Sequence, residues 1–84
     1  MLDREEYYGR DVLFIDPPYY DKACIGISYN DIAIYSLEKL VEILVEHDGM
    51  TDDQAIEYID YNICGAYVGE HTPIIMSTEF FNYR

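Results

Sequence analysis

The sequence predicts a single α+β domain, in which a small, largely antiparallel sheet with the order ββααβ packs two helices on one face. Two observations lead to this prediction. Two segments rich in β-branched and aromatic residues flank a two-residue turn, and two later segments repeat apolar residues at helical spacing between capping residues. Helices that follow strands in this order cover one side of a sheet. The 84 residues suffice for one core and not for two.

The N-terminal part of the chain is predicted to be irregular. Residues 1 to 10 are polar and lack periodicity, which indicates a loosely ordered segment. The apolar run at residues 12 to 15 stops at Asp16-Pro17-Pro18, because proline lacks an amide donor and restricts the residue before it. We therefore expect a short strand or loop entry here, followed by a turn.

A β-hairpin is predicted next. Residues 23 to 29 and 32 to 35 have the β-branched and aromatic composition of strands. Asn30-Asp31 between them tolerates the left-handed backbone of a two-residue hairpin turn. The two strands should therefore pair antiparallel.

The first helix has a clear start and a clear stop. Ser36 is the expected N-cap, and the helix should run to about His47. Asp48-Gly49 ends it, with glycine in the left-handed position after the last turn. The apolar stripe that should face the core consists of Leu37, Leu40, Val41 and Leu44.

The second helix follows almost at once. Thr51 and Gln54 form a capping box, and Met50 is placed to pack on Ala55 as a hydrophobic staple. Helical spacing then continues to Gly65 through Ala55, Ile56, Ile59 and Ile63. A last strand is expected at residues 73 to 76. The aromatic tail at residues 80 to 84, FFNYR, either docks on the fold or faces a partner.

Size and composition indicate a soluble cytoplasmic protein. The N-terminus has acids where a signal peptide has bases, and no apolar run approaches membrane-spanning length. We expect Cys24 and Cys64 to be reduced, buried thiols, although they could form one bridge. A chain this small has marginal stability, which dimerisation would increase.

The charge balance limits the choice of partner. Seventeen acids against five bases give a formal net charge of -12, which repels nucleic acid, anionic membranes and acidic substrates. Half of the residues are apolar and ten are tyrosine, so the chain can bury enough surface to fold. A folded acidic domain should bind basic partners.

One motif suggests catalysis. Asp16-Pro17-Pro18-Tyr19 resembles the signature of amino-methyltransferases that modify adenine N6 or cytosine N4. That resemblance implies that the acidic side chain would accept a hydrogen bond from the target amine and that the aromatic ring would stack on a flipped base. Such enzymes need a doubly wound sheet and a glycine-rich turn, and this sequence contains no Gly-x-Gly. We therefore interpret the motif as a proline-stiffened turn and do not expect an enzyme.

The sequence also provides little support for a metal-binding site or a catalytic cysteine. His47, Asp48, His71 and the cysteines carry suitable atoms, but their spacing matches no zinc or calcium motif. Asp52 and Asp53 are better explained by the dipole at the start of the second helix. Neither cysteine has a base near it in sequence. We expect no metal and no cofactor.

The acids are concentrated on the two predicted helices. Glu38, Glu42 and Glu46 recur every four residues, which corresponds to one helical face and a step of about 6 Å. Asp53, Glu57 and Asp60 repeat the pattern on the second helix. The pattern has two interpretations: a solvated outer face, or a surface that imitates a nucleic-acid backbone and binds a basic groove. Tyrosine is enriched in interfaces, which favours the second. The candidate partner-binding residues are Glu38, Glu42, Glu46, Asp53, Glu57, Tyr58, Asp60 and Tyr61.

Three segments, FIDPPYYDKACIGIS, EHDGMTDDQAIEYIDYN and GEHTPIIM, resemble a family of small acidic proteins from phages and prophages of Gram-positive bacteria. The resemblance covers residues 14 to 76 and carries no catalytic residue. By analogy it implies an inhibitor that acts in the host cytoplasm, of the anti-CRISPR or anti-restriction kind, that occupies the nucleic-acid-binding surface of a defence nuclease. The alternative is a small phage accessory protein that self-associates and binds a partner through its aromatic termini.

Overall fold

The computed structural model describes residues 3–7, 9–65 and 69–77, with the backbone alone for Cys64. The strands are β1 (Cys24–Ile27), β2 (Ala33–Ser36) and β3 (Ile74–Met76), and the helices are α1 (Leu37–Asp48) and α2 (Asp52–Ile59). Two 3₁₀ turns, η1 (Arg4–Tyr7) and η2 (Pro18–Ala23), precede the strands, and a π turn, η3 (Asp60–Cys64), extends α2. The α+β class and the ββααβ order are confirmed. The predicted tail at residues 80 to 84 lies outside the described residues.

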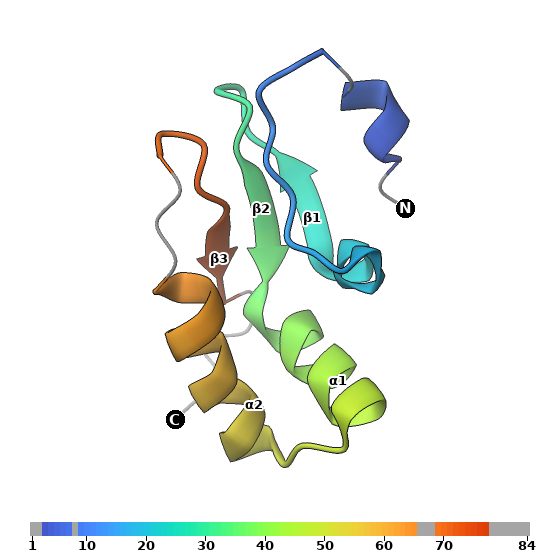
Figure 1. Cartoon of the computed structure of the whole chain (residues 1–84), viewed down its shortest axis with the longest axis vertical. Coiled ribbons are helices and arrows are strands. Elements are labelled where there is room, and N and C mark those ends of the chain that lie inside the picture. The colour runs from blue at the N-terminus through green and yellow to red at the C-terminus, as the bar shows by residue number, and fades with distance from the viewer. Residues whose placement is uncertain (1–2, 8, 66–68, 78–84) are drawn as a thin grey trace.

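The three strands form a mixed sheet in the order β1-β2-β3. The β1–β2 hairpin is antiparallel as expected, whereas β2 and β3 pair in parallel. The prediction of a largely antiparallel sheet did not include this pairing. Two helices lie between β2 and β3 in the chain, and such a crossover lets a strand return in the same direction. Figure 1 shows both helices at the end of the sheet where β2 and β3 finish.

The caps form where the sequence predicts them, but the hairpin turn is longer than predicted. Ile27 pairs with Ala33 and the Ser28 amide donates to the Ile32 carbonyl, so the loop has three residues, 29–31, in place of the predicted two, and Asp31 has a φ of 63°. The Ser36 hydroxyl accepts from the Lys39 amide at the start of α1, and Gly49 ends that helix with a φ of 67°. Thr51 and Gln54 form the reciprocal capping box of α2. Regular α-helix ends at Ile59, but helical winding continues in η3 almost to the predicted end at Gly65.

The core lies between the sheet, the helices and η2. It consists of Tyr20, Ala23, Ala33, Tyr35, Leu40, Ile43, Leu44, Ala55 and Ile59. Tyr35 on the middle strand is fully buried, and its phenol oxygen accepts a hydrogen bond of 2.9 Å from the Ile15 amide. That bond holds the segment before η2 across the sheet (Figure 1). Burial raises the pKa of Tyr35 to about 12.

Arg4 anchors the N-terminal segment to the fold. Its guanidinium donates to both carboxylate oxygens of Asp21 at 2.7 to 3.1 Å, to Asp16 at 3.0 Å and to the Ile15 carbonyl at 3.1 Å. It also lies 4.9 Å from the centre of the Phe14 ring. The sequence predicts that residues 1 to 10 are loosely ordered, and that prediction did not include the attachment of Arg4. The residues that Arg4 contacts are all distant from it in sequence, so no local pattern indicates them.

We expect Arg4→Met to lower the free energy of unfolding by about 2–3 kcal/mol, because it leaves the half-buried Asp21 carboxylate without its bidentate partner. Arg10→Met is the matched control. Arg10 also pairs with an aspartate and lies over a tyrosine ring, but its side chain is 47% exposed against 26% for Arg4. Its loss should cost less than about 1 kcal/mol. Urea denaturation measures both values, and equal losses would contradict the anchoring role of Arg4.

We also expect stability to fall as the pH rises from about 10, the ordinary tyrosine pKa, towards the pKa of about 12 that Tyr35 has in the folded protein. The Tyr35 hydroxyl loses its proton at a lower pH in the unfolded chain than in the folded protein, so the free energy of unfolding decreases across that interval. Tyr35→Phe should reduce this pH dependence and, at neutral pH, cost about 1–2 kcal/mol, since the Ile15 amide loses its acceptor.

Denaturation in urea at a series of pH values measures this dependence. Tyr29→Phe serves as the control, because Tyr29 is fully exposed. An alkaline loss of stability that is the same in the Tyr35 variant and the control would disprove the role of Tyr35.

Candidate functional site

Five of the predicted partner-binding acids have exposed side chains, and we refer to them together as the acidic surface: Glu42, Glu46, Asp53, Glu57 and Asp60. On α1 the buried residues are Leu40, Ile43 and Leu44, so Glu42 and Glu46 lie on the opposite side of the helix. On α2 the same relation holds between the buried residues Ala55 and Ile59 and the exposed acids. Because α1 and α2 pack against each other, the two rows of carboxylates belong to neighbouring helices.

Glu38 differs from the other predicted acids. Its side chain is half-buried, and its carboxylate accepts hydrogen bonds from the hydroxyl groups of Ser36, at 3.4 Å, and Ser77, at 2.7 Å. It thereby ties the start of α1 to the end of β3. The fold uses this carboxylate, so Glu38 is not part of the acidic surface.

No basic side chain offsets the acidic surface within the part of the chain that the structure describes. The ion pairs found there join Arg4 to Asp16 and Asp21, and Arg10 to Asp31. Like charges at helical spacing repel by a few tenths of a kcal/mol per pair. The acidic surface therefore keeps some repulsive energy, which a basic partner would relieve.

The two predicted interface tyrosines have different positions. Tyr61 is 78% exposed, next to the acids of α2 and η3. Tyr58 is less exposed and lies at the boundary of two hollows. One is an open depression that it shares with Glu57 and Tyr61. The other is a more enclosed pocket.

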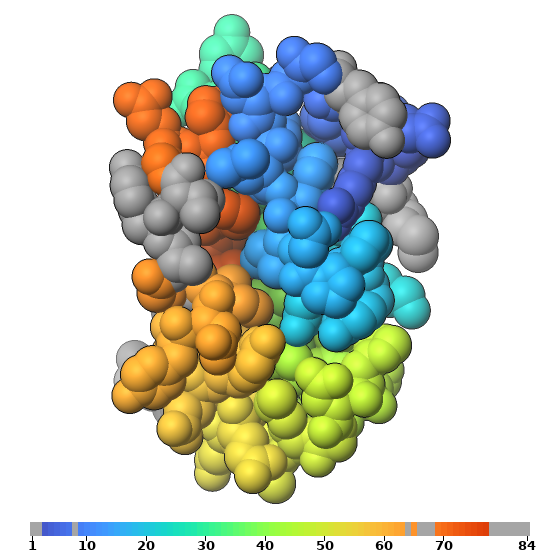
Figure 2. All heavy atoms as spheres, in the orientation of Figure 1, coloured from blue at the N-terminus to red at the C-terminus, as the bar shows by residue number. Residues whose placement is uncertain are grey.

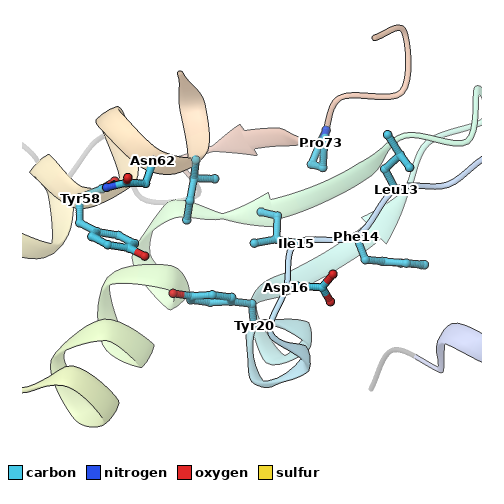
Figure 3. A pocket seen from close by; sticks show the side chains of 9 residues that line it. Leu13, Phe14, Ile15, Asp16, Tyr20, Tyr58, Asn62 and Pro73 are labelled. Carbon is cyan, nitrogen blue, oxygen red and sulfur yellow. The ribbon is translucent and has the colours of Figure 1, made fainter. Parts of the chain in front are cut away.

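This second hollow, the tyrosine pocket, has a volume of about 230 Å³. Its lining comes from four parts of the chain and consists of Leu13, Phe14, Ile15, Asp16, Tyr20, Tyr58, Asn62, Ile63 and Pro73. In Figure 3 the hydroxyl groups of Tyr20 and Tyr58 point toward each other at one end, and Leu13 and Pro73 lie at the other. Figure 2 shows the face on which α2 meets the N-terminal segment. Burial raises the pKa of Tyr20.

Apart from Tyr58, this pocket was not predicted from the sequence. Its residues are spread from position 13 to position 73, and no local pattern connects them. The apolar run at residues 12 to 15 is the nearest to a signal, because an irregular segment with three partly buried apolar side chains must pack on something.

The Asp16-Pro17-Pro18-Tyr19 motif is engaged within the fold. Asp16 pairs with Arg4 at 3.0 Å, and in Figure 3 its carboxylate points away from the two pocket tyrosines. The Tyr19 ring stacks on His47, with 4.4 Å between ring centres and an angle of 11°. The ring that would stack on a base is thus already covered on one side.

The remaining candidate ligands are dispersed. No three histidine, cysteine or acidic side chains among the described residues are grouped so that they could hold a metal ion. His71 meets the carbonyl oxygen of Asp31 through Nδ1, at 3.1 Å. Cys24 is a free, half-buried thiol whose pKa is raised by burial, which disfavours the nucleophilic thiolate. The side chain of Cys64 lies outside the described residues.

The helices of the described residues are all too short or too polar to cross a membrane. Comparisons with protein-family models, curated proteins and solved structures give no match for this chain. The resemblance to small phage proteins therefore stays a prediction. The function is inferred from the acidic surface and the tyrosine pocket.

Proposed function

We propose that the protein is an inhibitor that binds the basic, nucleic-acid-binding surface of another protein through its acidic surface. The partner class that we favour is a bacterial defence nuclease, with RNA-guided nucleases first, and the host cytoplasm is the proposed place of action. The observation that supports this most directly is the group of five exposed carboxylates on two packed helices, without a basic partner among the described residues.

The spacing of the carboxylates supports mimicry of nucleic acid. Residues four apart on a helix are separated by about 6 Å along its axis. Phosphates of one DNA strand are about 3.4 Å apart along the duplex axis, so every second phosphate falls at about 7 Å. A groove whose lysines and arginines bind alternate phosphates could therefore accept Glu42 and Glu46, or Asp53 and Glu57, in similar positions. The same charges repel nucleic acid, so competition is the expected mode of inhibition.

The proposal predicts that reversing four acids weakens inhibition. Glu42, Glu46, Glu57 and Asp60 all change to lysine, and none lies in the first turn of α1 or α2, where the dipole favours acids. Exposed charge pairs contribute about 0.2–1 kcal/mol each, so inhibition should weaken roughly tenfold or more. The measurement is DNA cleavage by a panel of RNA-guided and restriction nucleases, with increasing amounts of each protein variant.

The matched control reverses four exposed acids elsewhere, namely Glu5, Glu6, Asp11 and Glu70. Both variants carry the same net charge, so a difference between them reports position and not overall charge. Inhibition by wild type should also weaken as salt increases, since exposed charges are screened beyond about 8 Å at physiological ionic strength. Equal inhibition by the two variants, or no inhibition of any nuclease by wild type, would falsify the proposal.

One observation favours self-association as a second candidate function. On the face of the sheet opposite Tyr35, the neighbouring residues Ile74 and Met76 of β3 are 45% and 43% exposed. Exposed apolar side chains on a sheet surface are a common basis of dimer contacts. The aromatic tail that the sequence suggests for this role lies outside the described residues. Light scattering at increasing concentration tests this candidate: a dimer mass that Ile74→Lys converts to a monomer supports it, and a monomer throughout excludes it.

A further inference from the structure

We propose that the tyrosine pocket receives a single arginine side chain of the basic partner. The inference rests on the proposed function in one respect: it requires that the surface of the partner is basic. It adds a specific contact to a general attraction between charges. The pocket lining contains none of the five acids of the acidic surface. Its residue Tyr58 follows Glu57, one of those acids, directly in the sequence.

The size and walls of the pocket fit one long side chain. Its volume of about 230 Å³ is below the range of about 300–1,000 Å³ that is typical of pockets for drug-sized molecules. The walls include the apolar side chains of Leu13, Ile15 and Ile63, with Pro73 beside them. Such walls suit the aliphatic stem of arginine, which packs on apolar surface while its charged end stays near water.

The polar end of the pocket fits a guanidinium group. Two aromatic rings, Tyr20 and Tyr58, present their hydroxyl groups there, and hydroxyl oxygens accept hydrogen bonds (Figure 3). The amide nitrogen of Asn62 already donates to the Tyr58 carbonyl at 3.2 Å, which leaves its side-chain oxygen as an acceptor. A planar cation with five donors can stack on such rings and donate to these oxygen acceptors.

The chain's own Arg4 provides an internal example of this chemistry. It lies over the ring of Phe14 and pairs with Asp16, and both of these residues also line the pocket. Two residues of the pocket lining, Phe14 and Asp16, therefore already bind a guanidinium group of the chain itself. The net charge of -12 further raises the local concentration of cations around the protein.

The test uses NMR amide shifts of the intact protein with four short peptides, acetyl-Gly-Xaa-Gly-amide, in which Xaa is arginine, citrulline, lysine or norleucine. Citrulline keeps the shape of arginine without the charge, and norleucine keeps only the stem. The arginine peptide should shift the amides of Ile15, Tyr58 and Asn62. The citrulline and norleucine peptides should bind about tenfold more weakly, because they lose the cation–ring attraction.

Two variants test the location of binding. Tyr58→Leu removes one ring and one hydroxyl group and should weaken binding of the arginine peptide about tenfold. Leu13→Trp, at an exposed edge of the lining, should block the pocket without disturbing the core, and it serves where Tyr58→Leu does not fold. Tyr29→Leu is the control, since Tyr29 is fully exposed and lies outside the pocket. It should leave peptide binding unchanged.

Several results would overturn the inference. They are equal binding of the norleucine or lysine peptide, shifts confined to the acidic surface, and the absence of any shift. The assay contains no nuclease, so its failure leaves the inhibition proposal standing. Conversely, the charge-reversed protein can lose nuclease inhibition and still bind the arginine peptide, which would separate the two proposals.

Discussion

The buried hydrogen bond between the Ile15 amide and the Tyr35 hydroxyl is the contact on which the rest of the architecture depends. Tyr35 lies on the middle strand, fully buried, and the next residue, Ser36, caps α1. The bond holds an irregular segment across the sheet, where that segment has no strand pairing of its own. One wall of the tyrosine pocket is therefore positioned by a side chain of the core, and not by a flexible loop.

The distribution of the few basic residues explains why the acidic surface persists. Arg4 and Arg10 both pair with acids of the N-terminal half and lie over aromatic rings there. Lys39 is the one lysine or arginine on α1, and it is exposed. Folding thus pairs the arginines with acids near the hairpin, whereas the five acids of the acidic surface have no ion pair among the described residues. In a domain of 84 residues, that arrangement lowers stability in exchange for a charged surface.

The sequence predicted what is decided locally. The caps at Ser36 and Thr51 and the stop at Gly49 each depend on residues within four positions of one another, and they are confirmed, as is the antiparallel hairpin. The predicted two-residue turn of that hairpin is wrong, because the strands pair in a register that places three residues in the loop. Contacts between distant residues were not predictable, because nothing in a local pattern specifies them. Glu38 binds Ser77, 39 positions away, Arg4 binds Asp21, 17 positions away, and β3 pairs in parallel after a crossover. Helical spacing predicted the exposure of five acids, whereas the pocket beside Tyr58 joins distant segments and was missed for this reason.

A charged surface and a shaped pocket contribute differently to recognition. Exposed carboxylates attract a basic partner over several ångströms and increase the rate of encounter, but they discriminate poorly among basic surfaces. A pocket acts only at contact, where an enclosed side chain with satisfied donors contributes most of the selectivity. Many nucleic-acid-binding proteins are basic, so carboxylates alone would bind most of them weakly. If the protein selects one partner, the selection must come from a feature with a fixed shape, and the tyrosine pocket, held by Tyr35 through Ile15, has one.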